Sequence, residues 1–153
     1  MFKVHAASVE EYFRFDPARE DALRELDAVI RAAAPALSRW FVPGTPPGQP
    51  GMTMTMIGYG QYQYTVKSSP SPVTWPVLGI ALQKNYLSFY SNTYAADDAP
   101  FSCSYAGRLG GRARVSAKGV VTFTDIGDIS LQALAGMVGA IAAGLESGQL
   151  VAR

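Results

Sequence analysis

The middle of the chain alternates apolar and polar residues with a period of two. The alternation covers residues 53–56 and again residues 61–66, where tyrosines alternate with polar residues. Such a pattern is typical of strands with one buried face. Gly58 and Gly60 flank Tyr59 and predict a turn or a bulge between these two strands.

The most regular hydrophobic pattern covers residues 75–91 and predicts an antiparallel hairpin. Residues 77–82 carry no polar side chain, which is typical of a strand covered on both faces. Residues 84–85, a lysine and an asparagine, suit a two-residue turn because asparagine tolerates a positive φ angle. On the return strand Leu87 and Phe89 share one face. The other face of that strand carries Tyr86, Ser88 and Tyr90.

Both ends of the chain carry helical patterns. A capping box that begins at Ser8 predicts a short helix over residues 9–14. Asp16 suits the N-cap of a second helix, which has Pro17 in its first turn and which Pro35 ends. The apolar positions of this helix recur at helical spacing and are Ala22, Leu23, Leu26, Val29, Ile30 and Ala33. A last helix begins near Ser130, and its apolar stripe consists of Leu131, Leu134, Val138, Ile141 and Leu145.

The remaining segments predict loops and short elements. Residues 43–51 contain four prolines and three glycines, which is typical of a loop. Because this loop is too short to link domains, we expect a single domain. Residues 68–72 and 92–100 also predict loops, residues 102–109 a short helix, and residues 120–123 a strand.

Composition places the chain among globular proteins. It has 153 residues, of which 48% are hydrophobic and 16% charged, so a disordered chain is excluded. The formal net charge of +1 argues against binding to nucleic acid or to a membrane surface. The uncharged run over residues 129–145 is shorter than the roughly 20 residues of a membrane span. The N-terminus also lacks the apolar core of a signal peptide, so we expect a cytoplasmic protein.

Few residues suit a metal centre. His5 is the only histidine and Cys103 the only cysteine, so one chain provides neither a disulfide nor a His/Cys zinc site. Seven of the twelve acidic residues lie between Glu10 and Asp27, and such a helical face could bind a hard cation weakly. The favoured interpretation is a solvated face, because three acids precede an arginine by four residues. These pairs are Glu10–Arg14, Glu20–Arg24 and Asp27–Arg31.

Candidate catalytic groups are equally few. No Gly-x-Ser-x-Gly motif is present, and Cys103 has no evident activating base. The acid pairs Asp97–Asp98 and Asp125–Asp128 are interpreted as solvated or capping residues. A basic segment that consists of Arg108, Arg112, Arg114 and Lys118 is interpreted as a loop that balances the acidic helix. Whether the protein is an enzyme stays open, and a non-enzymatic protein is favoured.

Aromatic residues concentrate in or beside the predicted sheet. Tyrosines on one sheet face can line a pocket whose hydroxyl groups orient a ligand. Lys84 would add a charge if the hairpin tip folded over that face. The alternative, which we favour, is an aromatic core with hydroxyl groups at its rim. The candidate ligand-binding residues are Tyr59, Tyr62, Tyr64, Lys84, Tyr86 and Tyr90.

Several strings resemble the YdhG-like family of small bacterial proteins, largely a domain of unknown function. The matching strings are Ser8-Val-Glu-Glu-Tyr12, the helix from Asp16-Pro17 to Ala34-Pro35, Tyr59-Gly60, the stretch from Trp75 to Tyr90 with Gln83-Lys84-Asn85-Tyr86, and Val121-Thr-Phe123. The resemblance implies one α+β domain over residues 1–153, in which a curved antiparallel sheet is packed by N-terminal and C-terminal helices. Some members are described as frataxin-like iron chaperones. The loop over residues 43–51 and the glycine-containing stretch 93–118 depart from the family pattern.

Three functions are compatible with these observations. The leading one is non-enzymatic binding of a small ligand or a protein partner on the tyrosine-bearing sheet face, with no cofactor. The first alternative is an iron-binding chaperone. Its metal ligands would be Glu10, Glu11, Glu20 and Asp21. The second alternative is an enzyme of unidentified chemistry, and the oligomeric state is open.

Overall fold

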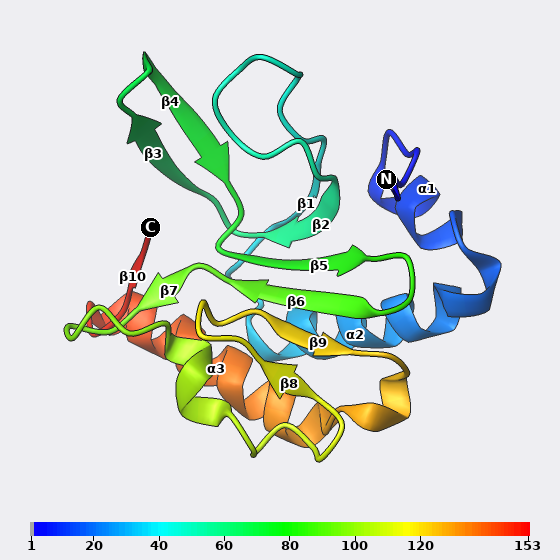
Figure 1. Cartoon of the computed structure of the whole chain (residues 1–153). Coiled ribbons are helices and arrows are strands. Elements are labelled where there is room, and N and C mark those ends of the chain that lie inside the picture. Colours follow the sequence, from blue (N-terminus) through cyan, green and yellow to red (C-terminus); the bar gives the residue numbers. More distant parts are fainter. Residues whose placement is uncertain (1) are drawn as a thin grey trace.

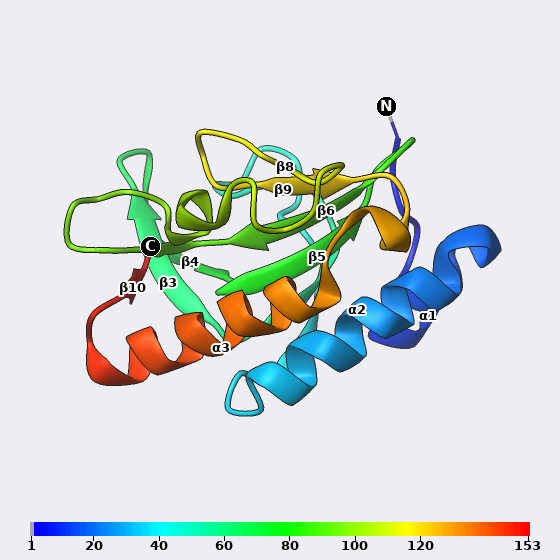
Figure 2. The same ribbon diagram turned by 90° about the horizontal axis from the view of Figure 1, so that it is seen from below.

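The computed structural model describes residues 2–153 as an antiparallel sheet with helices packed against one face (Figures 1 and 2). The six strands follow the order β1-β2-β5-β6-β9-β8. Their bounds are β1 (Arg39–Val42), β2 (Met56–Tyr59), β5 (Leu78–Leu82), β6 (Leu87–Ser91), β9 (Val121–Phe123) and β8 (Arg114–Val115). This arrangement confirms the α+β class and the packing of the sheet by helices from both ends of the chain.

Ser8 and Ser130 cap helices as the sequence predicts, whereas Asp16 caps a 3-10 turn and not the second helix itself, whose N-cap is Arg19. The Ser8 hydroxyl accepts the Glu11 amide at 3.1 Å at the start of α1 (Val9–Arg14). Asp16 caps the 3-10 turn η1 (Pro17–Arg19), which leads directly into α2 (Glu20–Ala33). The Ser130 hydroxyl accepts the Ala133 amide at the start of α3 (Leu131–Ser147). Two further 3-10 turns are η2 (Phe101–Tyr105) and η3 (Ile126–Asp128). No helix within residues 2–153 combines the length and the apolar content of a membrane span.

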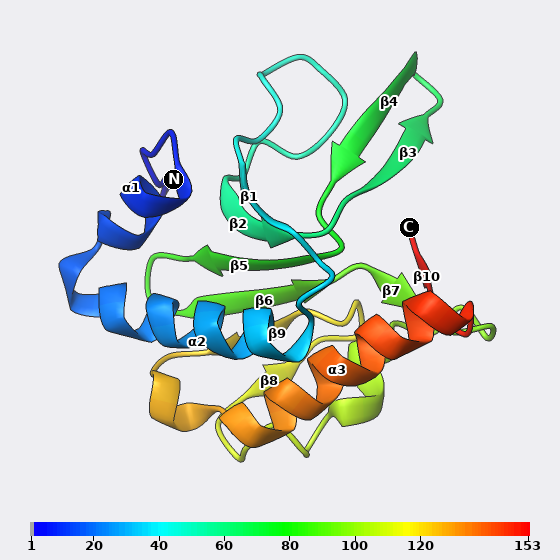
Figure 3. The ribbon, with the colours of Figure 1, turned by 180° about the vertical axis from the view of Figure 1, so that it is seen from behind.

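The main hydrophobic core lies between the sheet and the helices α2 and α3 (Figure 3). The period of two sends alternate residues of each strand toward the helices. The sheet contributes Ile57, Tyr59, Leu78, Ile80, Leu82, Leu87, Phe89, Val121 and Phe123. The helices contribute Tyr12, Phe13, Leu23, Leu26, Ile30, Leu134, Met137, Val138 and Ile141. We call this side of the sheet the inner face.

Two small ribbons extend the structure beyond the main sheet. β3 (Tyr62–Val66) pairs with β4 (Ser69–Trp75), and the register shifts between Tyr64 and Val66. β7 (Thr93–Tyr94) pairs with β10 (Val151–Ala152), so the C-terminal residues lie beside the strand that follows β6.

Several sequence-based boundaries were wrong. The strand predicted over 53–56 begins at Met56, and residues 69–72 of the loop predicted over 68–72 belong to β4. The helix predicted over 102–109 is replaced by the shorter turn η2. Strand β4 carries two prolines, which a two-stranded ribbon tolerates because each strand is an edge. The short strands β1, β7, β8 and β10 were not predicted, since two to four residues show no readable period.

Gly58 shows why one of these boundaries was misplaced. This residue lies inside β2 rather than in a turn. A Cβ atom on it would lie 2.7 Å from side-chain atoms of both Val42 and Pro76, so the glycine is required by packing. The predicted turn falls on Gly60, whose φ angle is +70°.

Candidate functional site

The face of the sheet opposite the helices, which we call the outer face, carries small residues along its centre. These are Gly58, Gly79, Ala81 and Ser88. Large side chains lie over this floor, and the sulfur of Met56 occupies the space in which a Gly79 Cβ atom would lie. Figure 2 shows that α2 and α3 both lie on the other side of the sheet.

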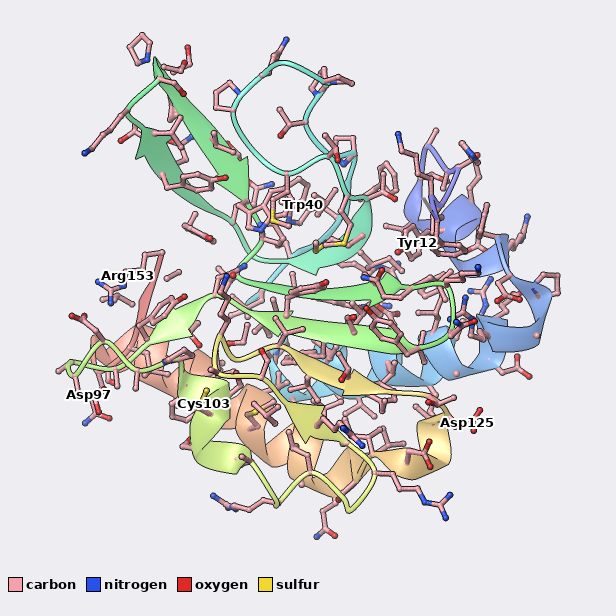
Figure 4. All side chains as sticks on the ribbon, viewed as in Figure 1. Tyr12, Trp40, Asp97, Cys103, Asp125 and Arg153 are labelled. Carbon is pink, nitrogen blue, oxygen red and sulfur yellow. The ribbon has the colours of Figure 1, made fainter. Side chains whose placement is uncertain are left out.

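A second hydrophobic group, the outer cluster, forms on this face. Its buried members are Val42, Met56, Trp75 and Ala81, and its half-buried members are Trp40, Met54, Tyr62, Tyr64 and Tyr90. Trp40 stands at the edge of the sheet near the loop that follows β1 (Figure 4), and its indole nitrogen donates to the Gly60 carbonyl at 2.9 Å. The outer cluster therefore presents aromatic rings that are only partly covered.

Polar atoms of the outer cluster lie close to one another. The Gln83 side-chain amide donates to the Tyr90 hydroxyl at 3.3 Å, and that hydroxyl lies 3.7 Å from the Met54 sulfur. The rings of Tyr62 and Tyr64 are 6.1 Å apart between centroids. Burial raises the pKa of Tyr62 to about 12 and also raises the pKa of Tyr90. Tyr62 and Tyr90 are therefore neutral hydrogen-bonding groups at physiological pH.

The structure brings together only part of the predicted ligand-binding set. Tyr62, Tyr64 and Tyr90 belong to the outer cluster. Tyr86 is 42% exposed at the end of the β5–β6 hairpin, beside the exposed Lys84. These last two side chains lie at the hairpin end and are not members of the outer cluster.

Tyr59 lies on the inner face, where it forms a buried polar network with Asp27. The Tyr59 hydroxyl donates to Asp27 Oδ1 at 2.6 Å, and Arg39 Nη1 donates to Asp27 Oδ2 at 2.7 Å. Burial, followed by the carboxylate of Asp27, raises the pKa of Tyr59. The predicted Arg31 partner is present at 3.7 Å. Arg39 could not be found from spacing, because it lies on a strand that the sequence did not reveal.

Two of the four predicted metal ligands form ion pairs. Glu10 accepts from Arg24 at 2.6 Å and pairs with Arg14 at 3.2 Å, and Glu20 accepts from Arg24 at 2.9 Å. The hydrogen bond from Arg24 lowers the pKa of Glu10. Glu11 and Asp21 are exposed on α1 and α2. Within residues 2–153 no three His, Cys, Asp or Glu side chains are grouped to hold a metal ion, and iron binding stays a prediction.

Other candidate groups make structural contacts. The Cys103 thiol donates to the Ser116 carbonyl at 3.4 Å. Asp125 and Asp128 form the capping box of η3, and Asp98 pairs with Arg153. These contacts agree with the interpretation of the acids as capping or surface residues. In the basic segment, the Arg108 guanidinium lies 4.2 Å from the centroid of the Tyr105 ring.

A cavity of about 210 Å³ lies next to the outer cluster. It is lined by Phe2, Lys3, Val4, Thr53, Met54, Thr55, Leu82 and Gln83. Met54 and Gln83 thus border both the cavity and the hydroxyl of Tyr90. No sequence pattern predicts this cavity, because its walls come from three segments that are far apart in the chain.

Comparisons of the chain with protein-family models, with curated proteins and with solved structures found no match. The resemblance to the YdhG-like family therefore stays a prediction.

Proposed function

We propose that this protein is a non-enzymatic binding domain that holds a small ligand or a protein partner on the outer cluster. The observation that carries the proposal is the partial burial of the rings of Trp40, Tyr62, Tyr64 and Tyr90 on a sheet face without a helix. Large rings with polar tips are the side chains that bind well when one side stays accessible.

The chemistry of the outer cluster favours a planar, largely apolar ligand. The rings and the Met54 thioether offer apolar contact, whereas the Tyr90 hydroxyl and the Gln83 amide offer hydrogen bonds. The four rings, Met54 and Gln83 are themselves uncharged. A neutral aromatic compound with one or two hydrogen-bonding groups, or an aromatic side chain of a partner, matches these features.

The proposal is for binding alone. The candidate nucleophile Cys103 donates to a backbone carbonyl, and the candidate acids Asp125 and Asp128 cap a turn. These contacts give each group a structural role, so no chemical step is derived from them.

Titration with planar fragments such as indole and 2-naphthol, followed by amide chemical shifts, tests this proposal. We expect shifts on β3 and β6, and an affinity about two- to tenfold lower for Tyr64→Ala, because one stacked aromatic pair contributes about 0.5–1.5 kcal/mol. Tyr105→Ala on η2 is the matched control and should leave the affinity unchanged. Shifts confined to other surfaces, or equal affinities for both variants, would overturn the proposal.

A further inference from the structure

Strands β2 and β5 separate at one end of their ladder. Their register pairs Tyr59 with Leu78 and Ile57 with Ile80, so its continuation would place Thr55 opposite Leu82. Thr55 lies outside β2, and the hydroxyl of Tyr12 stands between the two backbones instead. It accepts the Leu82 amide at 2.9 Å and donates to the Thr55 carbonyl at 3.3 Å. A side chain from α1 thus bridges the two segments where the ladder ends.

The N-terminal segment lies across this separation and closes it from one side. The Thr55 hydroxyl donates to the Val4 carbonyl at 3.4 Å. Phe2 and His5 pack against Phe15, with ring centroids 6.2 and 6.4 Å apart. The cavity of about 210 Å³ described above lies between this segment, the residues before β2 and the end of β5.

The lining combines an apolar body with a single charge. Phe2, Val4, Met54 and Leu82 provide apolar walls, and the remaining lining residues are neutral except Lys3. Lys3 is exposed and forms no ion pair with any other residue in 2–153, and no carboxylate lines the cavity. A ligand with an apolar chain and a negative terminus complements this arrangement.

We propose that the cavity binds a small monocarboxylate, with its apolar chain against Leu82 and Met54 and its carboxylate at Lys3. A volume of about 210 Å³ is below the range of about 300–1,000 Å³ typical of drug-sized ligands, so the ligand is correspondingly small. The cavity is distinct from the aromatic surface of the outer cluster, because none of the four half-buried rings lines it, although Met54 and Gln83 border both sites.

Titration with octanoate and with 1-octanol, followed by calorimetry and by amide shifts, tests this assignment. We expect octanoate to bind with shifts at Thr55 and Leu82. We expect Lys3→Gln to weaken octanoate binding by up to about fivefold, the effect of a partly exposed ion pair, and to leave 1-octanol binding unchanged. Lys84→Gln, which removes an exposed lysine outside the cavity, is the matched control and should bind octanoate as the native protein does.

A second variant separates the cavity from the outer cluster. Thr53 is exposed at the cavity rim, so Thr53→Trp should fill the space without disturbing the core and should abolish octanoate binding. Aromatic fragments should still bind to this variant. Octanoate binding that survives Thr53→Trp, equal effects of the two lysine substitutions, or no octanoate binding to the native protein would overturn the assignment.

Discussion

The two faces of the sheet are built from the same strands but from different kinds of side chain. The inner face carries large aliphatic residues together with Tyr59, Phe89 and Phe123, all of them buried. The outer face has a floor of small residues, over which Trp40 and three tyrosines lie half-buried. The sheet thus provides stability on its inner face, whereas the accessible rings on the outer side come from β1, β6 and the ribbon strand β3. This difference supports the proposal that the outer face is the binding surface.

Truncation of two adjacent residues in β6, one on each face, should show the largest difference in stability loss between the faces. Phe89→Ala opens a cavity in the inner core and should lower the free energy of unfolding by about 3–5 kcal/mol. Tyr90→Ala removes a half-buried ring and should cost clearly less. Urea denaturation of both variants measures the difference, and equal losses would contradict the distinction between the faces.

Removal of single hydroxyl groups should also lower the free energy of unfolding more on the inner face than on the outer face, but by a smaller margin. Tyr59→Phe leaves an oxygen of the buried Asp27 without its partner and should cost about 1–3 kcal/mol. Tyr90→Phe on the outer face loses only a half-exposed contact and should change stability by less than about 0.5 kcal/mol. Thermal unfolding of the two variants tests this order, and a larger loss for Tyr90→Phe would reverse it.

Addition of a methyl group tests the floor of the outer face. Gly79→Ala forces the flexible, buried Met56 side chain to move and should cost about 1 kcal/mol. At Gly136 on the exposed side of α3 nothing lies within 4 Å of an added Cβ. Gly136→Ala should therefore stabilise the protein by up to about 1 kcal/mol, because alanine favours helix. Chemical denaturation measures the free energy of unfolding of both variants. A change in the same direction for Gly79→Ala and Gly136→Ala would contradict this account of the floor.

Alkaline titration should show the smallest effect. Because burial raises the pKa of Tyr62 to about 12, this residue keeps its proton in the folded state after it would be lost from the unfolded chain. Its contribution to stability is therefore complete below pH 10 and is lost as the pH rises from about 10 to about 12. Tyr62→Phe should flatten the fall in stability over this range. If stability fell with pH as steeply in Tyr62→Phe as in the native protein, the alkaline loss of stability would come from other residues.

The sequence predicted those parts of the fold that depend on local patterns. The caps at Ser8 and Ser130 and the hairpin around residues 84–85 follow from neighbouring residues, although Asn85 does not adopt a positive φ angle. The contacts that were missed join distant segments. Arg39 meets Asp27 through a four-residue strand without a readable period.

The candidate site was predicted only in part for the same reason. The tyrosine-rich pattern identified Tyr62, Tyr64 and Tyr90, but period-two alternation could not show that Tyr59 would point to the other face. Gly60, with its φ angle of +70°, separates β2 from β3, so the alternation does not continue from one strand into the next. The partners Trp40 and Met54 come from segments on either side of the proline-rich loop, and only the folded sheet brings them together.

The position of the Tyr12 hydroxyl has a consequence for the dynamics of the sheet. The Leu82 amide is protected by a side chain of α1 rather than by a neighbouring strand. Its hydrogen exchange therefore reports the undocking of the N-terminal helix, whereas the amides in the middle of β5 report the opening of the sheet itself. One end of a central strand thus follows the motion of a helix instead of the motion of its own sheet.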